Sequence, residues 1–167
     1  MIFFHAITGV ISVVTGLVIV LSSKGTAVHK VTGRVYVASM YVLCFASFGI
    51  RDTTPFFKGF GMFHVMAIVS IATVTAGLVP ALYRSRFKDW FSAHYASMLW
   101  SYVGLIMALN SHFFREVFLF LSVRMELGKL IGLILSMALL WGVPPLLGTV
   151  LINRKAPLYY QKMKGRA

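Results

Sequence analysis

Five apolar segments, each long enough to cross a lipid bilayer, determine what this chain can fold into. They cover residues 2–21, 27–50, 59–82, 90–113 and 130–152. A helix rises about 1.5 Å per residue, so about twenty apolar residues cross the hydrocarbon core. A helix also satisfies its own backbone polar groups, which lipid requires. The sequence therefore predicts an all-α integral membrane helical bundle of five transmembrane helices, with residues 1–167 forming a single transmembrane domain.

The basic residues of the chain indicate membrane topology. There are sixteen Lys and Arg against four Asp and Glu, which gives a net charge of +12, but only 12% of all residues are charged. The basic residues stand in short connections between apolar segments, which favours contact with lipid phosphates over binding to nucleic acid. The single cysteine, Cys44, lies inside an apolar segment, and we expect it to be a packing residue.

The distribution of these charges predicts an orientation. Eleven Lys and Arg residues fall on one side of the five segments and five on the other. The positive-inside rule then places the N-terminus outside and the C-terminus in the cytoplasm, as in a multi-pass protein of the inner (cytoplasmic) membrane. Residues 115–129 are too charged to span and are expected to form an interfacial segment. Thr26 is a candidate N-cap of the second helix, and Pro144 and Pro145 are expected to kink the fifth helix.

Five histidines lie in or beside these segments, where an ionisable group is by default a functional-site hypothesis. His5 and His64 lie near the outer ends of the first and third segments, and His29 and His94 near the inner ends of the second and fourth. In a four-helix core that follows chain order, alternate helices face each other across a diagonal. Each pair would then hold a flat macrocycle between two imidazoles. His112 lies five turns after His94, at the outer end of the same segment.

Small residues follow the histidines at helical spacing. His5, Gly9, Ser12 and Gly16 form one stripe, and Gly33 follows His29 by one turn. Such a stripe would leave a groove for a cofactor, or it would let two helices pack closely. The sequence leaves both interpretations open.

The histidine pairs favour a b-type cytochrome that holds two haems b and transfers electrons across or within the membrane. Haem iron takes axial imidazoles, and haem carboxylates need cationic partners, for which Arg34 on the inner side and Arg51 on the outer side are candidates. The donor would be a quinol or a small reductant, so membrane oxidoreductase activity is one expectation. Besides the lipid bilayer, a quinone or redox partner and a second copy of the chain are candidate partners.

Two alternatives stay open. His5, His64 and His112 would form an outer-face site for zinc or copper, because three imidazoles and an open position are a catalytic zinc arrangement. His112 would otherwise replace one outer haem ligand. In a transporter or structural subunit without a cofactor, the histidines would instead relay protons or bond neighbouring helices.

Several short motifs resemble known families. The motifs are His5-Ala-Ile-Thr-Gly9, Lys24-Gly25-Thr26 with His29, Gly33, Arg34 and Tyr36, and His94 with Met98, Ser101 and Tyr102. They are similar to a family of small bacterial predicted inner-membrane proteins catalogued as a domain of unknown function, which implies several spans. The histidine plan is also similar to ascorbate-dependent two-haem transmembrane cytochromes b. That resemblance implies ligand pairs of His5 with His64 and His29 with His94, although no ascorbate-site motif accompanies them.

Overall fold

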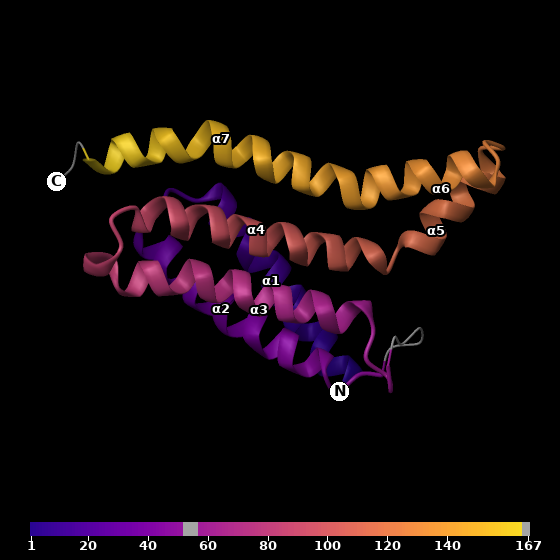
Figure 1. Ribbon diagram of the computed structural model, residues 1–167, viewed down its shortest axis with the longest axis horizontal. Coiled ribbons are helices and arrows are strands. Elements are labelled where there is room, and N and C mark those ends of the chain that lie inside the picture. The colour runs from indigo at the N-terminus through magenta and orange to yellow at the C-terminus, as the bar shows by residue number, and fades with distance from the viewer. Residues whose placement is uncertain (52–56, 165–167) are drawn as a thin grey trace.

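The computed structural model describes residues 1–51 and 57–164, and all the regular elements of the described residues are helices, as predicted (Figure 1). Four long helices come first: α1 (Ile2–Leu21), α2 (Ala27–Ser47), α3 (Met62–Leu82) and α4 (Trp90–Ser111). A short 3-10 helix, η1 (Arg84–Arg86), joins the last two. The remaining elements are α5 (Phe114–Leu119), the π-helical η2 (Phe120–Arg124), α6 (Lys129–Met137), the π-helical η3 (Ala138–Gly142) and α7 (Val143–Lys164).

Three helices of the described chain are long and apolar enough to cross a membrane: α1, α3 and the continuous helix Lys129–Tyr159. A fourth is added if Trp90–Ser111 and Phe114–Arg124, which are bent by 60° relative to each other, count as one span. α2 lies outside this set, because its first turns carry charged and polar side chains. The structure thus has three to four candidate spans where the sequence predicts five.

The first connection follows the sequence prediction, and the second does not. Thr26 caps α2, since its Oγ1 accepts a hydrogen bond from the backbone N–H of His29 at 3.2 Å. α2 then ends at Ser47, three residues before the predicted bound, and α3 begins three residues after its own. The late start of α3 follows from a tight turn in which Phe57 and Phe60 pair while Lys58 and Gly59 adopt positive φ, a backbone conformation that an α-helix does not contain.

The fifth predicted span is part of a longer helical run, α6–η3–α7, that continues past residue 152. The π-helical η3 lies where the kink is predicted, directly before Pro144 and Pro145 in the first turn of α7, and the kink itself stays a prediction. Most of residues 115–129 belong to α5 and η2, which pack against α6 as a helical hairpin. The two arms are close, since a Cβ added at Gly132 of α6 would lie 2.9 Å from Ser122 Cα of η2. Whether this hairpin lies at the membrane surface stays a prediction.

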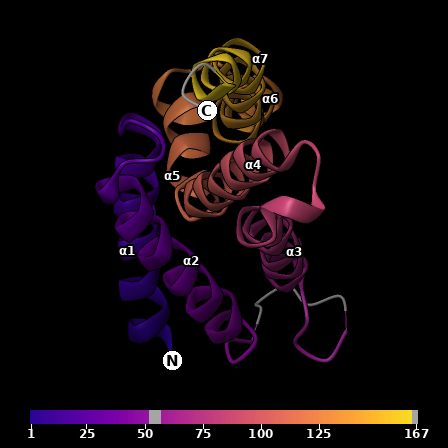
Figure 2. The same cartoon turned by 90° about the vertical axis from the view of Figure 1, so that its left-hand side faces the viewer.

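Consecutive helices from α1 to α4 pack side by side, and α4 also contacts α1 and α7 (Figure 2). The first four helices therefore form a ring in chain order, with α2 and α4 on one diagonal and α1 and α3 on the other. The core between them holds Tyr36, Met40, Val74 and Leu105, together with Cys44, which is buried as expected. The predicted four-helix core is thus present, and it brings His29 of α2 and His94 of α4 toward each other.

Candidate functional site

One end of the ring gathers the chain segments that carry most of the basic residues. The α1–α2 connection meets the end of α7 there, with Lys24 Nζ 5.6 Å from the centre of the Tyr159 ring. Tyr159 also lies 5.8 Å from the ring of Tyr95 in α4. We call this the basic end. Its basic residues with described side chains are Lys24, Lys30, Arg34, Arg84, Arg86, Lys88, Arg154 and Lys155.

His29 and His94 meet at the basic end. Their ring centroids are 6.4 Å apart and the ring planes are at 87°. The Thr26 cap sets His29 in the first turn of α2, and His94 lies one turn into α4. Both rings are partly buried. The structure therefore joins two imidazoles from diagonally opposed helices, and we call them the inner pair.

Hydrogen bonding leaves nitrogen lone pairs available in the inner pair. His94 Nδ1 donates to the backbone carbonyl of Gly77 at 2.8 Å, because a carbonyl can only accept. In a neutral ring the free lone pair then belongs to Nε2. His29 Nδ1 is buried and has no hydrogen-bond partner in the described parts of the chain. A buried, unpaired polar atom is unfavourable unless something binds to it.

Helices α2 and α4 make a second contact beyond the inner pair, further along both helices. Tyr36 and Ser101 are buried, and their hydroxyl oxygens are 2.9 Å apart. Each lies seven residues beyond its histidine, hence on the same helix face and about 10 Å further along the helix. Between the two levels, a Cβ added at Gly33 would meet no atom within 4 Å. The space beside His29 is therefore open, whereas Tyr36 and Ser101 are in contact at the next level of the helix ring.

Two cations of the basic end are held by backbone carbonyls and aromatic rings. Lys24 Nζ donates to the carbonyls of Ile19, Val20 and Ser22 at 2.6–3.1 Å, which satisfies the end of α1. Burial lowers the pKa of Lys24. Arg84 lies 4.4 Å from the Trp90 ring and donates from Nε to Ala81 O. Arg34, the cation predicted to pair with a haem carboxylate, is exposed.

At the opposite end, His64 serves as a helix cap. It is buried, and its Nδ1 accepts a hydrogen bond from the backbone N–H of Gly61 at 3.0 Å. Its ring stacks on Phe60 with centroids 4.8 Å apart. A neutral His64 therefore carries its proton on Nε2. His5 makes a long contact of 3.4 Å from Nδ1 to Ser47 Oγ instead.

The other predicted outer residues are exposed. His112 ends α4, and its ring stacks on Phe63 at 5.6 Å. Arg51 packs its side chain near the tight turn, 3.6 Å from the position of a Cβ at Gly59. Over residues 1–51 and 57–164, no group of three His, Cys, Asp or Glu side chains is arranged to hold a metal ion. The three outer histidines are thus not assembled as a metal site.

The small-residue stripe of α1 serves close packing. Ser12 is fully buried and donates to Ser39 Oγ of α2 at 2.8 Å. Gly16 lies against the ring of Tyr102, and its added Cβ would be 3.1 Å from Tyr36. Aromatic rings from α2 and α4 occupy the groove that small side chains leave. Of the two interpretations left open by the sequence, close packing is correct at Ser12 and Gly16.

A family model described as predicted membrane protein (DUF2306) matches residues 2–147. The chain belongs to this family. The match confirms the resemblance to membrane proteins of unknown function, and it covers both histidine levels and α1 to α4 in full. No curated protein and no solved structure matches the chain.

Sequence reasoning missed the groups that position the inner pair. The backbone carbonyl of Gly77 leaves no trace in a residue pattern, because every residue has one. The Tyr36–Ser101 contact does have a signal. Both residues stand in the family-like motifs, each seven positions after a histidine. Equal offsets on two helices that share a diagonal indicate a second contact between them.

Proposed function

We propose that this family member is a b-type cytochrome that transfers electrons across or within the membrane. One haem b would be bound by the inner pair, and a second by His5 and His64 near the opposite end. A quinol or a small reductant would donate the electrons, so the chain would act as a membrane oxidoreductase.

The separation of the inner-pair rings is the observation that carries this proposal. Two imidazoles that bind one metal ion from opposite sides have centroids roughly 6 Å apart, because metal–nitrogen bonds are about 2.0–2.1 Å long. His29 and His94 are 6.4 Å apart. They also come from opposite corners of a helix ring, so a flat ligand between them would lie between α1 and α3.

The surroundings of the inner pair suit a haem ligand site. A ligating histidine usually donates its other ring N–H to a carbonyl, as His94 does to Gly77. Open space at Gly33 leaves room beside His29. The cations of the basic end, with Lys30 and Arg34 on the surface of α2, would pair with haem carboxylates. The bound haem would supply one-electron chemistry, and these residues would hold and orient it.

The second haem demands a local change. Coordination through Nε2 would place the His64 proton on Nδ1, which at present accepts from Gly61. A haem there would therefore displace the cap of α3, and His112 is available as a substitute ligand. We keep His5 and His64 as the proposed outer pair.

The proposed topology has five spans, with the N-terminus outside and the C-terminus in the cytoplasm of an inner membrane. α2 would also span the membrane and bring the number of spans to five, with its charged first turns at the headgroup level. Gathering of eight described basic side chains at one end supports this orientation, since basic connections stay cytoplasmic. Arg51 at the opposite end would face the outer haem.

The visible spectrum of the purified full chain tests the proposal. Protein produced with adequate haem supply and reduced with dithionite should show a Soret band and an α band. His29→Ala and His94→Ala should each remove the inner haem, whereas His112→Ala, on the exposed end of α4, should retain it. Gel filtration and far-UV circular dichroism verify that each variant is folded.

Other outcomes would refute the haem assignment. A wild-type spectrum without a Soret band would sink it. Stoichiometric zinc or copper that disappears in His112→Ala would support the three-histidine metal site instead. Substrate flux into vesicles by a protein with neither chromophore nor metal would support a transporter.

A further inference from the structure

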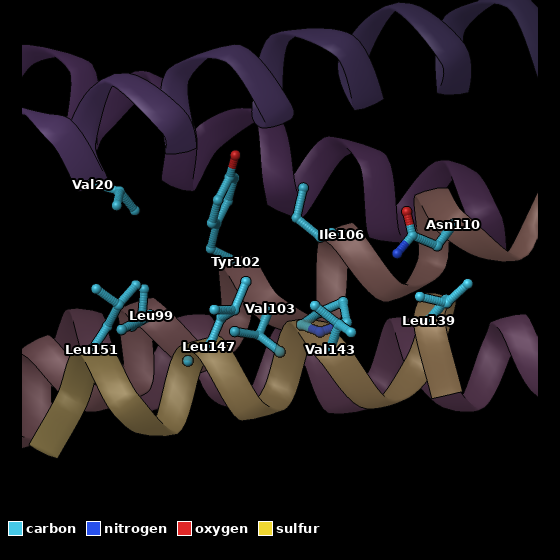
Figure 3. Close-up of a pocket in the computed structure, with 12 residues that line it drawn as sticks. Val20, Leu99, Tyr102, Val103, Ile106, Asn110, Leu139, Val143, Leu147 and Leu151 are labelled. Carbon is cyan, nitrogen blue, oxygen red and sulfur yellow. The ribbon is translucent and has the colours of Figure 1, made fainter. Parts of the chain in front are cut away.

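An apolar cleft of about 340 Å³ lies outside the ring, between α4, the end of α1 and the η3–α7 helix (Figure 3). Val20 and Leu151 line one end of the cleft, and Asn110 and Leu139 line the other. None of the five histidines contributes to its wall. The cleft is therefore separate from the proposed haem sites.

The polar groups in the wall are already committed within the protein. The Tyr102 hydroxyl donates to the backbone carbonyl of Val13 at 3.2 Å. Asn110 Nδ2 donates to Leu140 O at 2.8 Å. These bonds use the one O–H of Tyr102 and one of the two amide N–H groups of Asn110, so these two side chains keep a single free donor in a wall that is otherwise apolar. The wall is suited to a hydrocarbon chain.

The length of the cleft matches one leaflet of a bilayer. Leu139 and Leu151 are twelve residues apart along one helix, which corresponds to about 18 Å. One leaflet contributes roughly half of the ~30 Å hydrocarbon thickness. Val143 and Leu147 stand between them on the same side of the helix. A single acyl chain would fill the cleft from end to end.

Positive charge marks the end of the cleft at Leu151. Arg154 and Lys155 follow Leu151 by three and four residues, so they continue its helix face, and both are exposed. Lys24 lies nearby on the α1–α2 connection, against Tyr159. The connections of this end carry one acidic residue, Asp89. An amphiphile in the cleft would therefore meet cations where its head group emerges.

We propose that the cleft binds one acyl chain of an anionic phospholipid, with the lipid phosphate against Arg154 and Lys155. The apolar wall selects the chain, and the cations select the charge of the head group. The basic end would thereby recognise the lipid of one leaflet, and this lipid would pack α7 against α1 and α4. This binding does not depend on haem.

Native mass spectrometry of the delipidated full chain in detergent tests the proposal. Dioleoyl phosphatidylglycerol and dioleoyl phosphatidylcholine share their chains and differ in head-group charge. We expect one phosphatidylglycerol per chain, bound about 10-fold more tightly than phosphatidylcholine, because two basic side chains attract a head group with a net negative charge, whereas the choline cation balances the phosphate of phosphatidylcholine. The double variant R154Q/K155Q should bind both lipids equally.

A matched pair of variants on α7 tests the cleft itself. Leu147→Trp would fill the cleft and should weaken phosphatidylglycerol binding at least about 10-fold, since the chain can no longer enter. Leu146→Trp adds the same ring at a position outside the cleft and should bind like wild type; both leucines are exposed, so both variants should fold. Equal binding by Leu147→Trp and Leu146→Trp would refute the site. So would equal affinity of the wild type for the two lipids, or a retained quinone.

Discussion

At the scale of single residues, two glycines one turn or more beyond a histidine have opposite surroundings. Gly16 of α1 touches the ring of Tyr102, and Gly33 of α2 faces open space. The same sequence argument, a small residue on the stripe of a histidine, applies to both. Only the presence or absence of a neighbouring side chain separates close packing at Gly16 from open space at Gly33.

This difference predicts opposite effects of adding a methyl group. Gly16→Ala should lower stability by about 1–3 kcal/mol, because the methyl would overlap the Tyr102 ring in a filled core. Gly33→Ala should keep or raise stability by up to about 1 kcal/mol, because alanine favours a helix and nothing obstructs it. Thermal melting in detergent, followed by circular dichroism, measures both. Equal melting temperatures for the two variants would contradict the packing described.

The open space at Gly33 also allows a test of the haem proposal that leaves every histidine intact. Gly33→Leu should fold, since its side chain enters unoccupied space, yet it should lower the haem content of the inner site. The Soret absorbance per chain is the measurement. Leu146→Ala, at an exposed position on α7, is the control. Gly25→Ala would not serve, because Gly25 has a positive φ that alanine rarely adopts.

At the scale of elements, α4 replaces a hydrogen bond that a proline removes from the η3–α7 helix, and we call this replacement the repair. Pro144 has no N–H to give to the carbonyl four residues before it, which belongs to Leu140. Asn110 of α4 donates to that carbonyl from its side chain. The π-helical η3 takes up the remaining mismatch, so the long helix continues through both prolines. The Asn110 side chain therefore joins the α6–η3–α7 helix to α4 by a hydrogen bond.

The repair predicts coupling between the two helices. Asn110→Ala should lower stability by about 0.5–2 kcal/mol, because the Leu140 carbonyl loses its donor inside the membrane. In a Pro144→Ala background the restored N–H should supply that donor, so Asn110→Ala should cost less there. A double-mutant cycle of melting data measures the coupling; simple additivity would refute the repair. Ser111→Ala, which loses only a bond within α4, is the control.

At the scale of the whole molecule, charge is concentrated at one end of the ring. Segments far apart in sequence converge there, since Lys24 comes from the α1–α2 connection, Tyr95 from α4 and Tyr159 from α7. The proposed haem ligands His29 and His94 and the proposed lipid phosphate site lie at this same end. Orientation in the membrane therefore decides which compartment both sites face.

The proposed orientation predicts the accessibility of single cysteines. Cys44 is the single cysteine of the chain, so in a Cys44→Ser background an introduced cysteine is the one thiol that can react. Lys58→Cys should react with a membrane-impermeant maleimide added to intact cells, because its turn would lie outside. Ser23→Cys, exposed at the basic end, should react only after the membrane is permeabilised. The reverse pattern would invert the proposed topology.

The sequence by itself determined the helical class, the membrane environment, the Thr26 cap and the levels of the histidines. These follow from local physics: the length of apolar runs, the spacing of residues on a helix and the placement of charge. Tertiary structure alone decided which histidines meet. His29 and His94 come together because α2 and α4 share a diagonal, whereas a backbone N–H captures His64 as a helix cap. Depth in a membrane is a property of one helix, but a ligand pair needs two helices at a set distance, and only packing sets that distance.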